Sequence, residues 1–344
     1  MRELISNIRE WKKQNKNITL ATVVKAYGSA PQPVGSMMSV NDAMQFDGSV
    51  SGGCVEGDVI RQSMKVTHSE TPKLVKYGIS DDTALDFGLA CGGEIEVFIE
   101  PFTEVHEKMI ELLENKEFFA TATILSGIHT GKKWLMLSSG DFISGVSTDE
   151  FQPIIRPLIH STLQSKKAQK IQANIAGETV DVFCCVFPPP ARLMIVGAVH
   201  IAVPLVNLAR LFGFDTYVID ARSAFATEER FPNVDHLIHE WPAEALNRLG
   251  IDENTFITFL SHDDKMDNPA LLIALSSKAP YIGALGSRKT HAKRLQSLLE
   301  MGIEPGLLDR IHAPIGLKIG AVGAEQIAFA IMAEIIAVMN GVSS

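Results

Sequence analysis

Apolar residues in the N-terminal part of the chain recur at spacings that predict alternating helices and strands. Leu4, Ile5, Ile8 and Trp11 follow helical spacing, which favours an amphipathic helix over 2–15. Further on, β-branched runs predict strands and longer amphipathic stretches predict helices. The expected strands are 18–26, 36–40, 73–77 and 94–99, with a turn at Asp47-Gly48 and helices over 54–67 and 106–115.

The same order of elements recurs further along the chain. Ala120-Thr-Ala-Thr-Ile-Leu125 resembles Ala21-Thr-Val-Val24, and later strands and a helix follow at matching intervals. These later elements are a strand over 134–138, a helix over 153–163 and a strand over 180–187. The pattern predicts an N-terminal α/β domain, residues 1–187, with a degenerate internal duplication whose second half spans about 117–187.

Three consecutive prolines, Pro188 to Pro190, mark the expected boundary of this domain, because proline continues neither a helix nor a central strand. Continuous apolar strands of the kind buried in parallel sheets follow, alternating with helices. We expect strands over 192–197, 215–220, 255–260 and 279–284, and helices over 200–213 and 323–339. Residues 191–344 are therefore predicted to form a Rossmann-like domain with a doubly wound parallel sheet.

Composition narrows the function classes. Hydrophobic residues make up 46% of the 344 positions and charged residues 21%, as in ordinary globular proteins. A net charge of −9 argues against a nucleic-acid partner, and no run of 18 apolar residues is present to span a membrane. The charged N-terminus is unlike a secretory signal, and four cysteines are too few for a disulfide framework. A cytoplasmic protein with reduced thiols is expected.

Two cysteine-bearing turns stand out in the first domain, Ser51-Gly-Gly-Cys-Val-Glu56 and Ala90-Cys-Gly-Gly-Glu94. Together with the turn at Gly28-Ser-Ala-Pro31, they are expected to converge at strand ends. Glycine lets a ligand approach the backbone, and a helix N-terminus binds anions and lowers a thiol pKa. The alternative is a set of ordinary turns with small, buried cysteines. The second half of the duplication lacks both elements, which suggests that folding does not require them.

The candidate cofactor-binding residues of the first domain come from these three turns. They are Gly28, Ser29, Gly52, Gly53, Cys54, Glu56, Cys91, Gly92 and Gly93. Cys184 and Cys185 lie on a predicted strand, where core packing is the expected role.

The glycine fingerprint of the second domain is incomplete. Dinucleotide-binding loops follow Gly-x-Gly-x-x-Gly/Ala, but this chain has Gly197-Ala-Val-His-Ile-Ala202, with Val199 where the pyrophosphate needs a glycine. Asp220 would suit a ribose hydroxyl or would cap a turn with Arg222, and His200 would contact a ligand or lie in solvent. The fold is expected to be of the Rossmann type, whereas NAD(P) binding is doubtful.

Two further turns of this domain carry polar residues where ligands of open α/β sheets bind. Ser261-His-Asp263 with Asp267 indicates a polar site, and a metal is a minor alternative there. Gly286-Ser-Arg288 at a helix start indicates either an anion cradle or a simple cap. The candidate residues of the second domain are Gly197, His200, Asp220, Arg222, His262, Asp263, Ser287 and Arg288.

The chain resembles the XdhC/CoxI family of xanthine dehydrogenase accessory factors over essentially its whole length. The segments that carry the resemblance are both cysteine turns, Tyr281-Ile-Gly-Ala-Leu-Gly-Ser-Arg288 and Pro314-Ile-Gly-Leu-Lys-Ile-Gly320. The family's Rossmann loop usually reads Gly-Ala-Gly-His, whereas this chain has Val199 in place of the second glycine. The family also commonly has Thr-His-Asp-His where this chain has Ser261-His-Asp-Asp264, so Asp264 replaces the second histidine.

The resemblance implies an accessory protein that transiently binds the molybdenum cofactor, molybdopterin, and delivers or protects it. It further implies a homodimer, an apo xanthine dehydrogenase or related molybdenum hydroxylase as partner, and a cofactor sulfurase as a further partner. Cys91 or Cys54 would be the molybdenum ligand. On this interpretation the chain is more an accessory protein than an enzyme, and the name xanthine dehydrogenase would describe its partner.

Two alternatives stay open. One is an NAD(P)-dependent oxidoreductase that acts through the C-terminal domain. The other is a scaffold that supports maturation through protein contacts alone.

Overall fold

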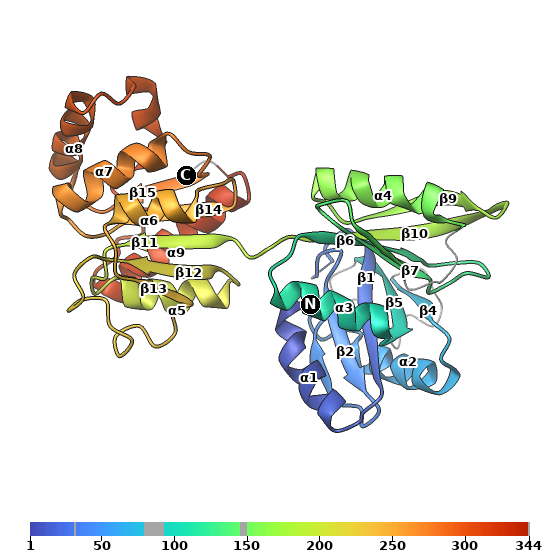
Figure 1. Cartoon of the computed structure of the whole chain (residues 1–344). Helices are drawn as coiled ribbons and strands as arrows, with labels where there is room; N and C mark the ends of the chain where they lie inside the picture. Colours follow the sequence, from blue (N-terminus) through green and yellow to red (C-terminus); the bar gives the residue numbers. More distant parts are fainter. Residues whose placement is uncertain (31, 79–92, 145–149, 343–344) are drawn as a thin grey trace. The chain divides into compact units, whose positions relative to one another are not determined.

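Two five-stranded antiparallel sheets with the same strand order form the first part of the chain (Figure 1). The structure is a computed structural model that describes residues 1–30, 32–78, 93–144 and 150–342. The chain divides into two compact units, residues 1–189 and 190–344. We describe each unit by itself.

The first sheet has the order β3-β2-β1-β5-β4 and the second the order β8-β7-β6-β10-β9. The elements of the first half are a short 3-10 turn (Arg2–Leu4), α1 (Ile5–Lys13), β1 (Ile18–Tyr27), β2 (Met37–Asn41), β3 (Phe46–Gly48), α2 (Glu56–Ser69), β4 (Lys73–Tyr77) and β5 (Glu94–Pro101). Those of the second half are α3 (Glu104–Glu114), β6 (Phe119–Ile124), β7 (Lys133–Leu137), β8 (Phe142–Ser144), α4 (Gln152–Ser165), β9 (Gln169–Ile175) and β10 (Glu178–Phe187). Because every strand and helix of one half has a counterpart in the other, the predicted duplication is confirmed.

The two sheets of this unit bury apolar residues on both of their faces. Successive side chains of a strand point to opposite faces, so each sheet contributes to two cores. One core holds Leu20 and Phe98 of the first sheet together with Leu135 and Phe183 of the second, and α1 and α3 pack against it. The outer face of each sheet is covered by one helix, α2 on the first sheet and α4 on the second. The duplication thus forms layers in the order helix, sheet, sheet, helix.

A buried ion cluster joins the two halves. Glu100 of β5 is 4% exposed, and its Oε1 lies 2.7 Å from Lys133 Nζ of β7 and 3.3 Å from His106 Nε2 of α3. Burial alone would raise the pKa of Glu100, but Lys133 and His106 outweigh it and lower that pKa to about 2. The carboxylate therefore stays charged and ties strands of both sheets together.

The second unit is a six-stranded parallel sheet with the order β13-β12-β11-β14-β15-β16. Numbered along the unit, this is the 3-2-1-4-5-6 order of a Rossmann fold, as predicted. Its elements are β11 (Arg192–Val196), α5 (Ala202–Leu211), β12 (Asp215–Ile219), β13 (His236–Ile238), α6 (Pro242–Leu249), β14 (Thr255–Phe259), α7 (Asp264–Leu275), β15 (Tyr281–Ala284), α8 (Arg288–Glu300), a 3-10 turn (Pro305–Arg310), β16 (Ile311–His312) and α9 (Ala324–Met339). Helices α5 and α9 pack in the core of one face, and α6 and α7 in that of the other.

Several boundaries differ from the sequence expectations. Asp47-Gly48 lies in β3, because the preceding turn closes earlier, where Asn41 Oδ1 accepts hydrogen bonds from the amides of Ala43 and Gln45. Helix α2 begins at Glu56, two residues later than expected. The sequence patterns did not identify β9, β13, β16, α6 and α7. Strand β9 does alternate polar and apolar residues from Ile171 to Ile175, but this signal was not used. Strands β13 and β16 are only three and two residues long.

Some helices are shorter or longer than predicted by up to three residues at one end. The structure gives Ile5–Lys13 where 2–15 was expected, Ala202–Leu211 where 200–213 was expected, and Glu104–Glu114 where 106–115 was expected. Across the described ranges, no helix combines the length and apolar character needed to cross a membrane.

The packing predicts one large stability effect. Trp134 of β7 is fully buried under α4 and meets the ring of Phe151 edge-on at 6.1 Å. We expect Trp134→Ala to lower the free energy of unfolding of residues 1–189 by about 3–5 kcal/mol, because it removes a large buried ring and leaves a cavity. Urea unfolding followed by hydrogen–deuterium exchange measures the change. Ile128, which is 86% exposed in the same unit, is the control, and Ile128→Ala should cost less than about 0.5 kcal/mol. Equal losses in the two variants would contradict this packing.

Candidate functional site

The carboxylate of Glu56 organises the Gly-Gly-Cys loop. Glu56 is the first residue of α2 and is only 7% exposed. The hydroxyl of Ser49 donates to Oε1 over 2.6 Å, and the hydroxyl of Ser51 donates to Oε2. Four backbone amides also donate to this one carboxylate: Val50 at 3.2 Å and Ser51 at 2.8 Å to Oε1, and Gly53 at 2.9 Å and Val55 at 3.2 Å to Oε2. The loop is thereby wrapped around its own glutamate.

These hydrogen bonds hold Glu56 in its charged form. Burial alone would raise the pKa of Glu56, but the hydrogen bonds from Ser49 and Ser51 outweigh it and lower that pKa to about 2. The Ser51 hydroxyl also accepts a hydrogen bond from the Val55 amide at 2.9 Å, which keeps residues 51–55 out of the helix. The later start of α2 follows from this arrangement.

Most amides of the loop are therefore not free to bind an external anion as the sequence suggested. Those of Ser51, Gly53 and Val55 serve Glu56, and that of Gly52 donates to Ser49 Oγ at 2.8 Å. The solvent-exposed part of the loop is its tip. Gly52, Gly53 and Cys54 are exposed, and a Cβ built at Gly53 would meet no atom within 4 Å. The Cys54 residue is thus exposed on a loop whose backbone conformation is fixed by hydrogen bonds to Glu56.

The other turns gather partly at the same end of the sheet. Gly93, just before β5, packs so tightly on the end of β1 that a Cβ there would lie 2.9 Å from the Ala30 amide and 3.1 Å from the Tyr27 carbonyl. Gly28 and Ser29 are exposed beside it. Ala30 packs on the apolar cluster that contains Val50 and Val55. The turn at Gly28 therefore adjoins Gly93 and shares an apolar cluster with the base of the Gly-Gly-Cys loop. Cys91, Gly92 and Pro31 lie outside the described residues.

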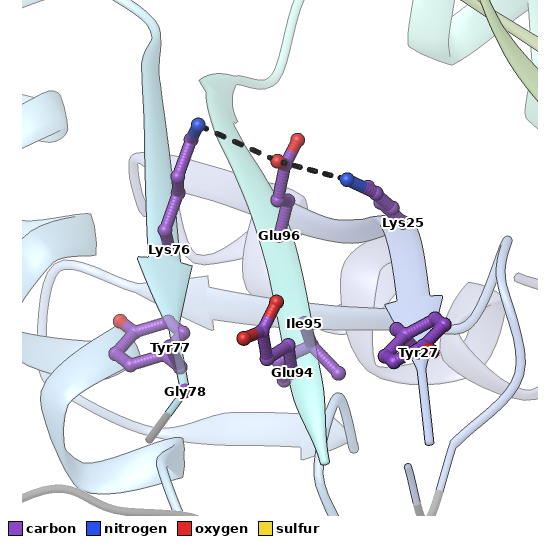
Figure 2. Close-up of a pocket in the computed structure, with 8 residues that line it drawn as sticks. All are labelled: Lys25, Tyr27, Lys76, Tyr77, Gly78, Glu94, Ile95 and Glu96. Carbon is purple, nitrogen blue, oxygen red and sulfur yellow. Dashed lines mark ion pairs between the residues drawn. The ribbon is translucent and has the colours of Figure 1, made fainter. Parts of the chain in front are cut away.

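A charged pocket opens at this end of the sheet (Figure 2). Glu96 of β5 lies between Lys25 of β1 and Lys76 of β4, at 3.9 and 3.5 Å. Lys170 of β9 approaches the same carboxylate to 2.6 Å, so three lysines surround it. The cavity measures about 210 Å³, and Tyr77 forms part of its lining.

Tyr77 links this pocket to α2. Its hydroxyl donates to Asp58 in the first turn of that helix at 2.9 Å. The pocket and the Gly-Gly-Cys loop are therefore both connected to the first turn of α2, through Asp58 and Glu56 respectively. The sequence patterns missed the lysines and this tyrosine, and their only signal was their position near the strand ends.

The described cysteines differ sharply in their surroundings. Cys184 and Cys185 of β10 are buried, and burial raises the pKa of Cys184 to about 11 and that of Cys185 to about 12. Both are protonated core residues, as expected from the sequence. Cys54 is exposed, so the expectation of a presented thiol holds for it and the alternative of a buried one does not.

In the second unit, Gly197 follows β11 in a left-handed conformation with φ of +102°. A Cβ there would lie 2.7 Å from the Ser261 amide, so only glycine fits between the ends of β11 and β14. Val199 is half-buried in the turn and His200 is exposed, both before α5 begins at Ala202. The loop thus keeps the first glycine of the fingerprint for packing.

Asp220 caps its own turn, which was one of its two expected roles. It is fully buried, and Arg222 donates from Nε at 2.9 Å to Oδ1 and from Nη2 at 2.7 Å to Oδ2. The amides of Ala198 and Arg222 donate to the same carboxylate at 2.8 and 2.9 Å. A ribose would have to displace these partners.

The remaining candidates sit at the starts of α7 and α8. The Asp263 side chain caps α7 by accepting from the Lys265 amide at 3.0 Å, and the exposed His262 adopts a left-handed φ of +58°. Ser287 caps α8 by accepting from the Thr290 amide at 3.1 Å, and Arg288 is exposed. Among the described residues, no three His, Cys, Asp or Glu side chains cluster closely enough to hold a metal ion.

Glu56 predicts a pH-dependent stability effect. Its pKa is depressed in the folded protein, so its contribution is complete above about pH 4.5 and is lost as the pH falls toward 2. We expect Glu56→Gln to destabilise the first unit by about 2–3 kcal/mol near pH 7, since the amide group faces donors. Thermal unfolding between pH 7 and 2.5 should show this difference shrinking as the pH falls. Glu111→Gln on the exposed face of α3 is the control, and a difference that does not depend on pH would contradict the assignment.

Thiol labelling tests the contrast between the cysteines. We expect iodoacetamide to modify Cys54 in the native protein within minutes at pH 8, because its thiol is exposed. Cys184 and Cys185 should react at least about 100-fold more slowly until urea unfolds the sheet. Peptide mass spectrometry at timed intervals gives the rates. Labelling of Cys184 as fast as that of Cys54 would disprove the buried assignment.

Comparison with known proteins agrees with this architecture. Residues 11–78 match the XdhC and CoxI family, and residues 193–335 match the XdhC Rossmann domain. The chain is 30% identical over 323 residues to a probable xanthine dehydrogenase subunit of Bacillus subtilis, covering 92% of each chain. It is 26% identical to the molybdenum cofactor insertion chaperone PaoD of Escherichia coli, covering 94% of this chain and 84% of that one.

A solved structure shows the same fold. The crystal structure of a xanthine dehydrogenase from Bacillus halodurans superposes with a TM-score of 0.78 at 26% identity, covering 99% of this chain and 96% of that one. With the match to both family regions and the near full-length relative from B. subtilis, the chain belongs to the XdhC and CoxI family.

Proposed function

We propose that this protein is an accessory factor that binds the molybdenum cofactor and delivers it to a xanthine dehydrogenase-type molybdenum hydroxylase. The observation that carries the proposal is the exposed Cys54 thiol on a loop whose backbone Glu56 fixes. The name of the E. coli relative, a molybdenum cofactor insertion chaperone, supports it.

The donor set suits such a cargo. Molybdopterin brings a dithiolene-bound metal and a phosphate, and soft thiolates are suitable ligands for soft metal centres. Cys54 would supply the thiolate, and Cys91 of the second cysteine turn is the other candidate. Lys25 and Lys76 at the same end of the sheet would meet the phosphate, since each is more than half exposed. A protein that must release its cargo benefits from such exposed contacts.

A rigid loop helps both binding and release. The hydrogen bonds to Glu56 set the conformation of residues 49–55 before any ligand arrives, so little backbone entropy is lost on binding. Release likewise requires no rearrangement of this backbone. The loop thereby acts as a fixed mount for one thiol.

The oxidoreductase alternative is weaker. NAD(P) would need the carboxylate of Asp220 for its ribose, and Arg222 with two amides already engages that carboxylate. Val199 stands where the pyrophosphate needs a glycine. A scaffold that acts through protein contacts alone would leave the exposed thiol without a role.

Cofactor binding under anaerobic conditions tests the proposal. We expect purified protein to bind molybdopterin cofactor, and Cys54→Ser or Cys91→Ser to weaken binding at least about tenfold, which is about 1.4 kcal/mol for one lost ligand. Bound molybdenum and pterin fluorescence give the affinity, and activation of an apo-hydroxylase gives delivery. Cys184→Ala, which removes a buried thiol, is the matched control.

The alternatives give different results in the same assay. If both the Cys54→Ser and the Cys91→Ser variant bound and delivered cofactor as well as the unmodified protein, the thiol role would be lost. Binding of NAD(H) or NADP(H) without pterin would favour the oxidoreductase. Maturation of the partner without any pterin binding would favour the scaffold.

A further inference from the structure

Helices α7 and α8 of the second unit are neighbours (Figure 1). They carry five buried polar side-chain atoms without hydrogen-bond partners. Eleven such side-chain atoms occur in the described part of the chain, so nearly half are concentrated on these two helices. They are Asp267 Oδ2, Asn268 Oδ1, His291 Nδ1, Arg294 Nε and Arg294 Nη1. Buried polar atoms are normally paired, so such a concentration indicates a missing partner.

Arg294 is the principal donor of this group. It is 2% exposed and lies in the second turn of α8, from where its side chain reaches back toward the start of the helix. Nη2 donates to the Leu285 carbonyl at 3.2 Å, whereas Nε and Nη1 have no acceptor. Nη1 lies 3.9 Å from the position that a Cβ at Gly286 would take. The guanidinium therefore points at the turn before α8.

Asp267 is the facing acceptor. It is fully buried in the first turn of α7, and its Oδ1 accepts from the Ser261 hydroxyl at 2.6 Å. Its Oδ2 lies 3.8 Å from Arg294 Nη2, too far for a hydrogen bond, and has no donor. A buried cation with free N–H groups thus stands beside a carboxylate with a free oxygen.

An isolated buried guanidinium is costly unless an anion pairs with it through hydrogen bonds. The partner that completes this arrangement must accept from Arg294 and share a proton with Asp267. A phosphate group has oxygens for the first task and, as a monoanion, an O–H for the second. Sulfate and simple carboxylates lack that proton at neutral pH.

We propose that the turn from Leu285 to Ser287, together with Arg294 and Asp267, binds the phosphate group of a small phosphorylated molecule. The site lies at the carboxyl end of β15, where ligands of open α/β sheets bind. Ser287 and Thr290, whose hydroxyls are 2.9 Å apart at the start of α8, add donors at its mouth. Since the Arg294 atoms are covered, the Gly286 turn must move outward to admit the ligand.

The charges around Asp267 make this binding depend on pH. The pKa of Asp267 is raised to about 6, chiefly by burial and to a smaller extent by Asp263 and Asp264 at the start of α7, while the Ser261 hydrogen bond and Arg294 of α8 lower it. Arg222, after β12, also interacts electrostatically with Asp267. Burial and the charge of Arg294 lower the pKa of the neighbouring His291 of α8. A phosphomonoester loses its second proton near pH 6, about where Asp267 loses its own. A single proton shared between Asp267 and the phosphate group therefore satisfies both.

Isothermal titration of the full-length protein with inorganic phosphate and with sulfate, at pH 6 and pH 8, tests the site. We expect phosphate to bind at least tenfold more tightly than sulfate, and more tightly at pH 6 than at pH 8. Arg294→Met should weaken phosphate binding at least tenfold. Lys293→Gln removes an exposed positive charge from the same helix and should change it less than twofold.

Asp267→Asn gives a result that a structural role alone would not. The amide of Asn can donate a hydrogen bond to an anion oxygen that carries no proton, as in sulfate. The affinity for sulfate relative to that for phosphate should therefore rise at least tenfold. This change of selectivity decides the question even where Arg294→Met fails to fold. Unchanged selectivity in Asp267→Asn, or equal losses in the Arg294 and Lys293 variants, would overturn the proposal.

Two further arms identify the source of the phosphate. A nucleoside monophosphate and molybdopterin are titrated alongside inorganic phosphate, and each should compete with it in the unmodified protein but not in Arg294→Met. The one that binds most tightly names the ligand class, and binding by none of the three refutes the site. Because Cys54 lies in the other unit, Cys54→Ser separates failure of this site from failure of cofactor binding at the thiol.

Discussion

The carboxylate of Glu56 is the constraint on which the candidate site depends. A glycine-rich loop normally gains its mobility from the absence of side chains. Here four amides and two hydroxyls of residues 49–55 converge on one buried carboxylate, so the loop has a fixed conformation despite its two glycines. The glycines leave the tip of the loop open to a ligand, and the glutamate holds the loop backbone in one conformation. The thiol at the tip is consequently both exposed and well positioned, a combination that neither residue would provide alone.

The duplication shows that the packing of the helix on its sheet does not require this glutamate. Helices α2 and α4 are each 14 residues long, both end in a left-handed residue, and both cover the outer face of an equivalent sheet. At the first position of α4 stands Gln152 where α2 has Glu56. Buried positions correspond along both helices, as with Val59 and Ile155. The second half therefore keeps the packing of the first without the charge that organises its loop, so the helix–sheet packing and the loop conformation depend on different residues.

Sequence patterns predicted the elements whose residues are uniformly apolar or strictly periodic. The parallel strands of the second unit are such runs, and the matching strands of the duplication repeat each other closely enough to be paired. Strand β9 was missed although Ile171, Ala173 and Ile175 alternate with polar residues, because this edge strand carries only three apolar residues. The fate of the loop amides could not be predicted either, since it depends on one carboxylate turning back over six residues. Arg294 looks like any basic residue on a helix, and only the folded chain shows it buried.

The Rossmann unit illustrates how a fold can keep its topology while its usual ligand contacts change. Strand order and the first glycine are present, but Gly197 is needed for the close approach of Ser261, and Asp220 is neutralised within its own turn. The residues that would bind a dinucleotide at the point between β11 and β14 are thus committed to internal structure. Five of the buried polar atoms without hydrogen-bond partners lie instead on α7 and α8, the helices before and after β15. Because such atoms cost free energy unless a partner satisfies them, this concentration is the basis for the phosphate site that we propose there.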